Sequence, residues 1–228
     1  MSTPVRNIPT PAANQLSDVQ IVRAGKMDIE QLADIFSLGL TYDCSPFLWS
    51  HTTEQARRLP VGHETWDILC AVSELWPRHR TNEALLSVAT HAYNRTHADS
   101  LATATRGREI TADVGNIRFI GTVDCAARIT AVGDRPAIIA VDVADSETFL
   151  RYGRDQLLNT LLMEWDGTGL VQGFVSDGLM FCFVAVDHSM VFQSPTYHID
   201  RREDLIVIYN RLLDMLRFWP DAQPQPQQ

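Results

Sequence analysis

Five segments of the chain repeat apolar residues at intervals of three and four positions. This spacing places the apolar side chains on one stripe and predicts amphipathic helices. Asp28 and Ser146 precede two of these stripes and are predicted to cap their helices, and Pro77 is predicted to end the second helix. The predicted helices cover residues 28–36, 63–76, 81–93, 146–165 and 201–218.

After the third predicted helix the pattern changes to short apolar segments bounded by turn residues, which predicts strands. Residues 137–141 read Ala-Ile-Ile-Ala-Val, an unbroken apolar run that is typical of a strand buried on both faces. Gly133-Asp134 and Asp177-Gly178 are predicted turns, the second of them in a hairpin. The predicted strands cover residues 117–120, 125–132, 137–143, 170–175 and 180–186, with a short edge strand at 191–192.

The order of these elements predicts an α+β fold in which helices and a mixed sheet form a sandwich. The helix at 146–165 is long enough to be a crossover, so the strands that contain Ile138 and Val171 are expected to pair in parallel. We expect a single domain over residues 19–219. The polar, proline-containing segments 1–18 and 220–228 are expected to be disordered tails.

The charge of the chain limits its mode of binding. A net charge of −9 over 228 residues argues against a broad electrostatic grip on nucleic acid but not against a local groove. Lys26 is the only lysine. No apolar run is long enough to cross a bilayer and no signal segment is evident, so we expect an intracellular protein, cytoplasmic or nuclear, without membrane contact. The oligomeric state does not follow from the sequence.

The four cysteines are scattered without a C-x-x-C pair, which argues against a cysteine-based zinc site. Two acids at neighbouring predicted strands are the better candidates for chemistry. Asp124 lies in Val-Asp-Cys, and Asp142 ends the buried strand. Converging carboxylates are ligands that Mg²⁺ or Mn²⁺ accepts, and such an ion can polarise a phosphate. Each acid alone also fits a plainer structural role, in which Asp124 accepts a backbone amide and Asp142 caps the following helix.

The α-β-β-β-α-β order resembles the core of the PD-(D/E)XK nuclease superfamily. The resemblance implies a restriction-endonuclease-like fold and a metal site made by Glu64, Asp124 and Asp142. Glu74 and Glu83 are rivals for the place of Glu64. A closer likeness is to uncharacterised fungal proteins with this core, some joined to kinase-like or Crinkler-type effector modules. It rests on Glu-Thr-Trp at 64–66, Val-Asp at 123–124, Gln156 and the hairpin segment 173–183.

The chain departs from the family at one position of chemical importance. The family's acidic-x-Lys reads Asp-Val-Ala here, so Ala144 stands where the resemblance implies the lysine that stabilises the transition state. Arg151 and Arg154 in the next helix are candidates to replace its charge, although arginine cannot act as a base. Gln156 is a candidate to position a water.

Three functions therefore stay open. The favoured one is a degenerate nuclease-like domain that acts as a binding or effector-like module for a protein or nucleic acid, with no metal if the degeneration is complete. The second is an active Mg²⁺-dependent nuclease whose cation has migrated. The third is an unrelated α+β protein that binds a small molecule.

Overall fold

The computed structural model describes residues 20–23, 26–41, 52–75, 80–130, 136–165, 167 and 169–222. The predicted N-terminal tail, the turn at Gly133-Asp134, Pro77 and Cys44 lie outside the described residues. The last helix includes residues 220–222, which the sequence places in the C-terminal tail, and the rest of that tail lies outside the described residues.

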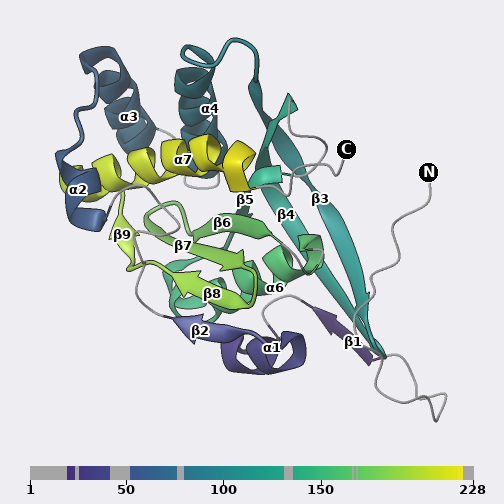
Figure 1. The fold of residues 1–228 in the computed structure, drawn as a ribbon. Coiled ribbons are helices and arrows are strands. Elements are labelled where there is room, and N and C mark those ends of the chain that lie inside the picture. The colour runs from purple at the N-terminus through teal and green to yellow at the C-terminus, as the bar shows by residue number, and fades with distance from the viewer. Residues whose placement is uncertain are drawn as a thin grey trace.

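Helices cover both faces of one mixed sheet, so the α+β class predicted from the sequence is confirmed (Figure 1). On one face lie α2 (Thr53–Arg58), α3 (His63–Leu75), α4 (Thr81–Asn94) and α7 (Arg202–Ala222). On the other lie α1 (Ile29–Phe36) and α6 (Arg154–Glu164), the latter preceded by α5 (Ser146–Thr148) and the π-helical turn η3 (Phe149–Gly153). No helix within the described ranges combines the length and apolarity needed to cross a membrane.

The main path of the sheet runs β1-β4-β5-β6-β7-β8-β2, with β3 paired to β4 and β9 paired to β7. The bounds are β1 Gln20–Arg23, β2 Gly39–Thr41, β3 Ala102–Val114, β4 Ile117–Ile129, β5 Pro136–Asp142, β6 Leu170–Ser176, β7 Met180–Asp187, β8 Met190–Gln193 and β9 Tyr197–His198. The strand predicted at 191–192 is present as β8, but the prediction that it lies at the edge of the sheet is wrong, because β8 is flanked by both β7 and β2.

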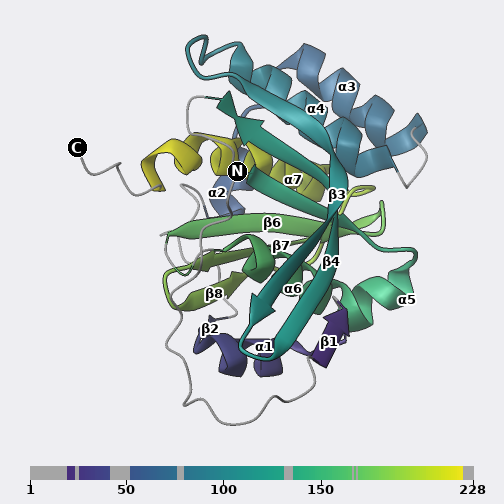
Figure 2. The same cartoon turned by 90° about the vertical axis from the view of Figure 1, so that its right-hand side faces the viewer.

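The three strands before the crossover differ from the three predicted. The predicted segment 117–120 and residues 125–129 of the next one belong to a single strand, β4, and residues 131–132 lie outside the described residues. The additional strand is β3, which the sequence pattern did not indicate. β3 pairs with β4 along its whole length and is rich in threonine and charged residues, so it lacks the apolar run used to recognise strands. In Figure 2 the two strands span the height of the molecule, from α3 and α4 down to α1 and β1.

The parallel crossover predicted from the sequence is confirmed. Residues 139–142 of β5 pair in parallel with residues 173–176 of β6, and the chain between them forms α5, η3 and α6. Every residue from Ala137 to Val141 is fully buried, as the unbroken apolar run indicated. Gly173 allows the two strands to approach, because a Cβ there would lie 2.2 Å from the carbonyl oxygen of Ile139.

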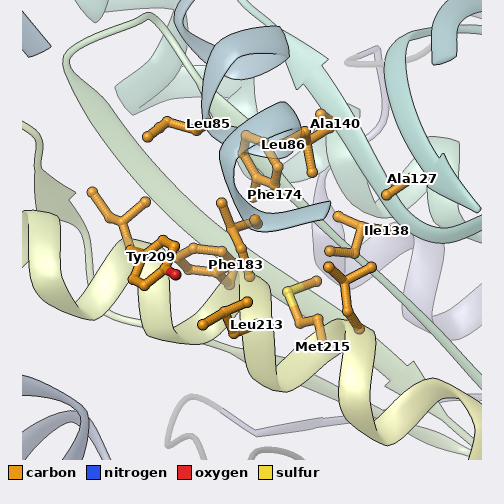
Figure 3. Packing of buried hydrophobic residues seen from close by; sticks show 14 of the residues in the cluster. Leu85, Leu86, Ala127, Ile138, Ala140, Phe174, Phe183, Tyr209, Leu213 and Met215 are labelled. Carbon is orange, nitrogen blue, oxygen red and sulfur yellow. The ribbon is translucent and has the colours of Figure 1, made fainter. Parts of the chain in front are cut away.

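Alternation along the strands divides the core between the two faces. Ile138, Ala140 and Phe174 face α4 and α7, whereas Ile139 and Val141 face α6. Figure 3 shows the first of these clusters, in which side chains of the sheet meet those of α4 and α7. β5 is therefore packed on both of its faces, and Asp142 is the last residue of this buried strand.

The predicted cap of the crossover helix is displaced by one residue. Asp145, not Ser146, accepts the amide of Thr148 at 2.7 Å and caps α5. The Ser146 hydroxyl instead donates to Asp177 Oδ2 at 2.5 Å and joins the crossover to the β6–β7 turn. Asp28 caps α1 as predicted.

Candidate functional site

Asp124 on β4 and Asp142 at the end of β5 lie in contact. The backbone amide of Asp142 donates to Asp124 Oδ2 at 2.8 Å. The ladder between the two strands ends at the pair Cys125–Ala140, so the Asp124 carboxylate takes the place of a main-chain acceptor just beyond it. The two acids expected from the sequence to lie together are joined by this bond from a main-chain amide to a side-chain carboxylate. The structural role considered for Asp124, acceptance of a backbone amide, is present as well.

The first turn of α4 adds an amide side chain to the acid pair. Asn82 Nδ2 donates to Asp142 Oδ1. Asn82 is 1% exposed, and its Oδ1 is buried with no hydrogen-bond partner in the described structure. A buried acceptor without a donor is costly. A cation or a proton next to this oxygen would satisfy it.

Burial raises the pKa of both acids. Removal from water raises the pKa of Asp142 to about 7, and the nearby charge of Asp124 raises it in the same direction. The hydrogen bond from Asn82 acts in the opposite direction and lowers this pKa. Burial also raises the pKa of Asp124, although the amide of Asp142 opposes it. Two acids that both resist ionisation in one place are a common property of functional sites, because a bound cation or shared proton relieves them.

Glu83 follows Asn82 on α4 and lies near the same site. Burial raises the pKa of the Cys125 thiol, and Asp142, Asp124 and Glu83 each raise it further, which puts all three carboxylates within electrostatic reach of Cys125. Glu83 Oε1 forms an ion pair with Arg106 Nε at 3.5 Å. Arg106 lies on β3 opposite Cys125. It is therefore a cation at the margin of the acid pair.

The structure places Glu64 elsewhere. Its side chain is 83% exposed and pairs with Arg95 at 3.8 Å. It lines a hollow between α3, α4 and α7, and neither Asp124 nor Asp142 lines that hollow. Of the three helix acids considered from the sequence, Glu83 is the one that the structure brings towards the pair. Within the described residues no three His, Cys, Asp or Glu side chains form a ready-made metal cluster.

The three candidates on the crossover also have other surroundings. Arg151 pairs with Glu147 at 3.0 Å on the surface of the crossover. Arg154 Nε donates to the sulfur of Cys182 at 3.2 Å. Gln156 lines a separate hollow of about 380 Å³ with Arg23, Glu109 and Thr122, and that hollow does not include either acid. The structure therefore gives these three side chains contacts away from Asp142.

The described structure brings no lysine to the position at which the resemblance implies one. Ala144 is exposed two residues beyond Asp142. Lys26 lies between β1 and α1, and among the described contacts none links it to either acid. Arg106 is linked to this part of the structure through its ion pair with Glu83.

Asn82 was not identified from the sequence. It is 60 residues from Asp142 in the chain and meets it only through packing of α4 on the sheet. The available signal was a polar Asn-Glu pair at the start of a helix directly before the strands.

No known family of proteins matches this sequence, and no curated protein matches it.

Proposed function

We propose that this chain is a degenerate nuclease-like domain that keeps a two-carboxylate cation site, is impaired in cleavage, and acts by binding a protein or nucleic acid partner. The contact between Asp124 and Asp142 at the end of β5, with alanine at 144, is the observation that carries the proposal. The element order α4-β3-β4-β5-α6-β6 with its parallel crossover supports it, because it is the α-β-β-β-α-β order of the PD-(D/E)XK core.

The residues at this site fit Mg²⁺ or Mn²⁺. Asp124 and Asp142 would hold the ion, with the orphaned Oδ1 of Asn82 as a third oxygen and Glu83 close by. Magnesium binds through one or two carboxylates and keeps several waters, so this hard oxygen set suffices. When bound, the ion would supply Lewis-acid polarisation of a phosphate oxygen.

Impaired cleavage follows from the missing ammonium group. Ala144 can neither hydrogen-bond a water nor stabilise charge on a phosphate. Arg106 is engaged with Glu83 and, as an arginine, stays protonated and cannot take a proton. Its position is nevertheless the observation that favours the second candidate, an active nuclease in which Arg106 supplies the charge.

Restoring the lysine is expected to produce cleavage. Ala144 is exposed, so Ala144→Lys should fold and place an ammonium beside Asp142. We expect nicking of supercoiled plasmid in Mn²⁺ to rise on the order of 10²-fold over the unmodified protein. The rate is measured by gel electrophoresis of the plasmid over time.

The control for this gain is the double variant Ala144→Lys with Asp142→Asn, which should return to background. Cleavage by the unmodified protein that is lost in Asp142→Asn and in Arg106→Ala would contradict the degenerate reading and favour the active nuclease.

Metal-binding measurements can distinguish the roles of the two helix acids, Glu83 and Glu64. Glu83 and Glu64 both lie in the first turn of their helices, so Glu83→Gln and Glu64→Gln form a matched pair. At a hundredfold excess of Mn²⁺ over its Kd, binding should stabilise the unmodified protein by about 2.7 kcal/mol and raise Tm by roughly 5 °C. We expect Glu83→Gln to weaken the Mn²⁺ affinity and Glu64→Gln to leave it unchanged, measured by calorimetric titration. Absence of any Mn²⁺ effect on Tm would refute the cation site.

A further inference from the structure

The largest hollow among those described lies away from the acid pair, between α3, α4 and α7. Its volume is about 750 Å³, which is within the range of small-molecule sites. The connection from Leu59 to Gly62 closes one side. Figure 3 shows Tyr209 and Leu213 of α7, two of its lining residues, where they meet the core.

The walls of this hollow are mainly apolar. Ile68 of α3 is 44% exposed, an unusual position for isoleucine, and Val88 and Ala92 of α4 are half-buried beside it. Leu213 continues this surface onto α7. Apolar side chains of three helices therefore line one hollow, with Ile68 exposed, and such a lining favours contact with an apolar ligand.

The rim carries positive charge. Arg95 and Arg217 line the hollow, against a single acid, Glu64. The chain as a whole has a net charge of −9, so this local excess of cations is opposite in sign to the rest of the protein. Such a rim attracts an anion.

Arg95 is available to an anionic ligand. It contacts Glu64 at 3.8 Å, and the two side chains are 65% and 83% exposed. An exposed pair of this kind contributes little stability, so a ligand carboxylate can replace Glu64 on the guanidinium in a bidentate contact.

We propose that the hollow between α3, α4 and α7 binds a small amphiphilic anion, with an apolar chain or ring against Ile68, Val88 and Leu213 and a carboxylate on Arg95. The other hollows suit such a ligand less well. Those at Gln156 and at Arg202 are lined mostly by polar or charged residues, and the one between α3, α4 and β3 has about 370 Å³.

The probe is decanoate, titrated by calorimetry into the full chain in EDTA, so that no divalent metal takes part. We expect saturable binding of one decanoate per chain, and binding of 1-decanol weaker by roughly tenfold, because the alcohol lacks the charge that Arg95 recognises. Arg95→Ala should weaken decanoate binding by a similar factor and leave decanol unchanged.

Two exposed aliphatic residues provide a matched test of location. Ile68→Glu places a carboxylate in the hollow and should weaken decanoate binding by at least about tenfold. Leu150→Glu makes the same kind of change on η3, where Leu150 is 71% exposed, and should have no effect. Ala92→Phe fills the hollow without adding charge and should also block binding.

Equal decanoate affinity in Ile68→Glu, Ala92→Phe and the unmodified protein would overturn the proposal, as would the absence of saturable binding. Equal affinity for decanoate and decanol would overturn its anionic part. Circular dichroism melting curves of each variant establish that losses of binding come from folded protein.

Discussion

Replacing Asp142 by asparagine is expected to raise the free energy of unfolding by about 2 kcal/mol at pH 8. Burial and the charge of Asp124 raise the pKa of Asp142 to about 7 in the folded protein, so ionisation there opposes folding. Asparagine removes the charge and keeps an oxygen that can accept from Asn82. The expected gain in stability is smaller than the full pKa shift of Asp142 would give, because this side chain is partly exposed to water.

The sign of the pH dependence follows from linkage. A raised pKa means that the folded protein holds the proton more tightly than the unfolded chain, so the stability of the unmodified protein declines as pH rises from about 4 to about 7. The advantage of Asp142→Asn should therefore be complete at pH 8 and shrink towards zero near pH 4. Urea unfolding at several pH values measures it.

Asp67→Asn is the control, because Asp67 is 64% exposed on α3. It should change stability by no more than about 0.5 kcal/mol at either pH. A loss of stability in Asp142→Asn at pH 8 would show that the charged carboxylate supports the fold, and the reasoning from burial would fail.

Gly173→Ala is expected to destabilise the protein by about 3 kcal/mol or more. The new Cβ would lie 2.2 Å from the Ile139 carbonyl oxygen and 3.1 Å from Leu157 Cδ1. The first contact is with backbone, so rotation of a side chain cannot relieve it, and β6 must move away from β5. Equilibrium unfolding in guanidinium chloride measures the loss.

Gly62→Ala provides the comparison, since a Cβ at Gly62 has nothing within 4 Å. Because Gly62 precedes α3, where alanine caps poorly, a cost of up to about 1 kcal/mol is expected. Similar losses in the two variants would contradict the close approach of β5 and β6. Since Asp142 ends β5, Gly173→Ala should also weaken Mn²⁺ binding, whereas Gly62→Ala should not.

The elements predictable from the sequence are those whose burial leaves a pattern in the residues themselves. The apolar run at 137–141 indicated a strand buried on both faces, and the length of the following segment indicated the parallel crossover. β3 was missed because it pairs along one side only, with β4, and a strand of this kind can consist of threonine and charged residues. Its existence depends on its partner more than on its own hydrophobicity.

The candidate site divides in the same way. Asp124 and Asp142 could be paired from the sequence because they are close along the chain and lie on strands predicted to be neighbours. The contact of Asn82 depends on how α4 packs on the sheet, which local periodicity does not specify. Arg151 lies within the π turn η3 and Arg154 directly follows it, so neither side chain has the direction that an uninterrupted α-helix would give it.

The hydrogen bond from the Asp142 amide to Asp124 links the chemistry of the site to the alignment of two strands. A one-residue slip of β4 along β5 would offer the amide the side chain of Val123 or Cys125, neither of which carries a carboxylate oxygen. The acid pair therefore exists only when the sheet is correctly aligned. A misaligned, partly folded chain would lack the proposed cation site, so a cation that binds there would selectively favour the native alignment during folding.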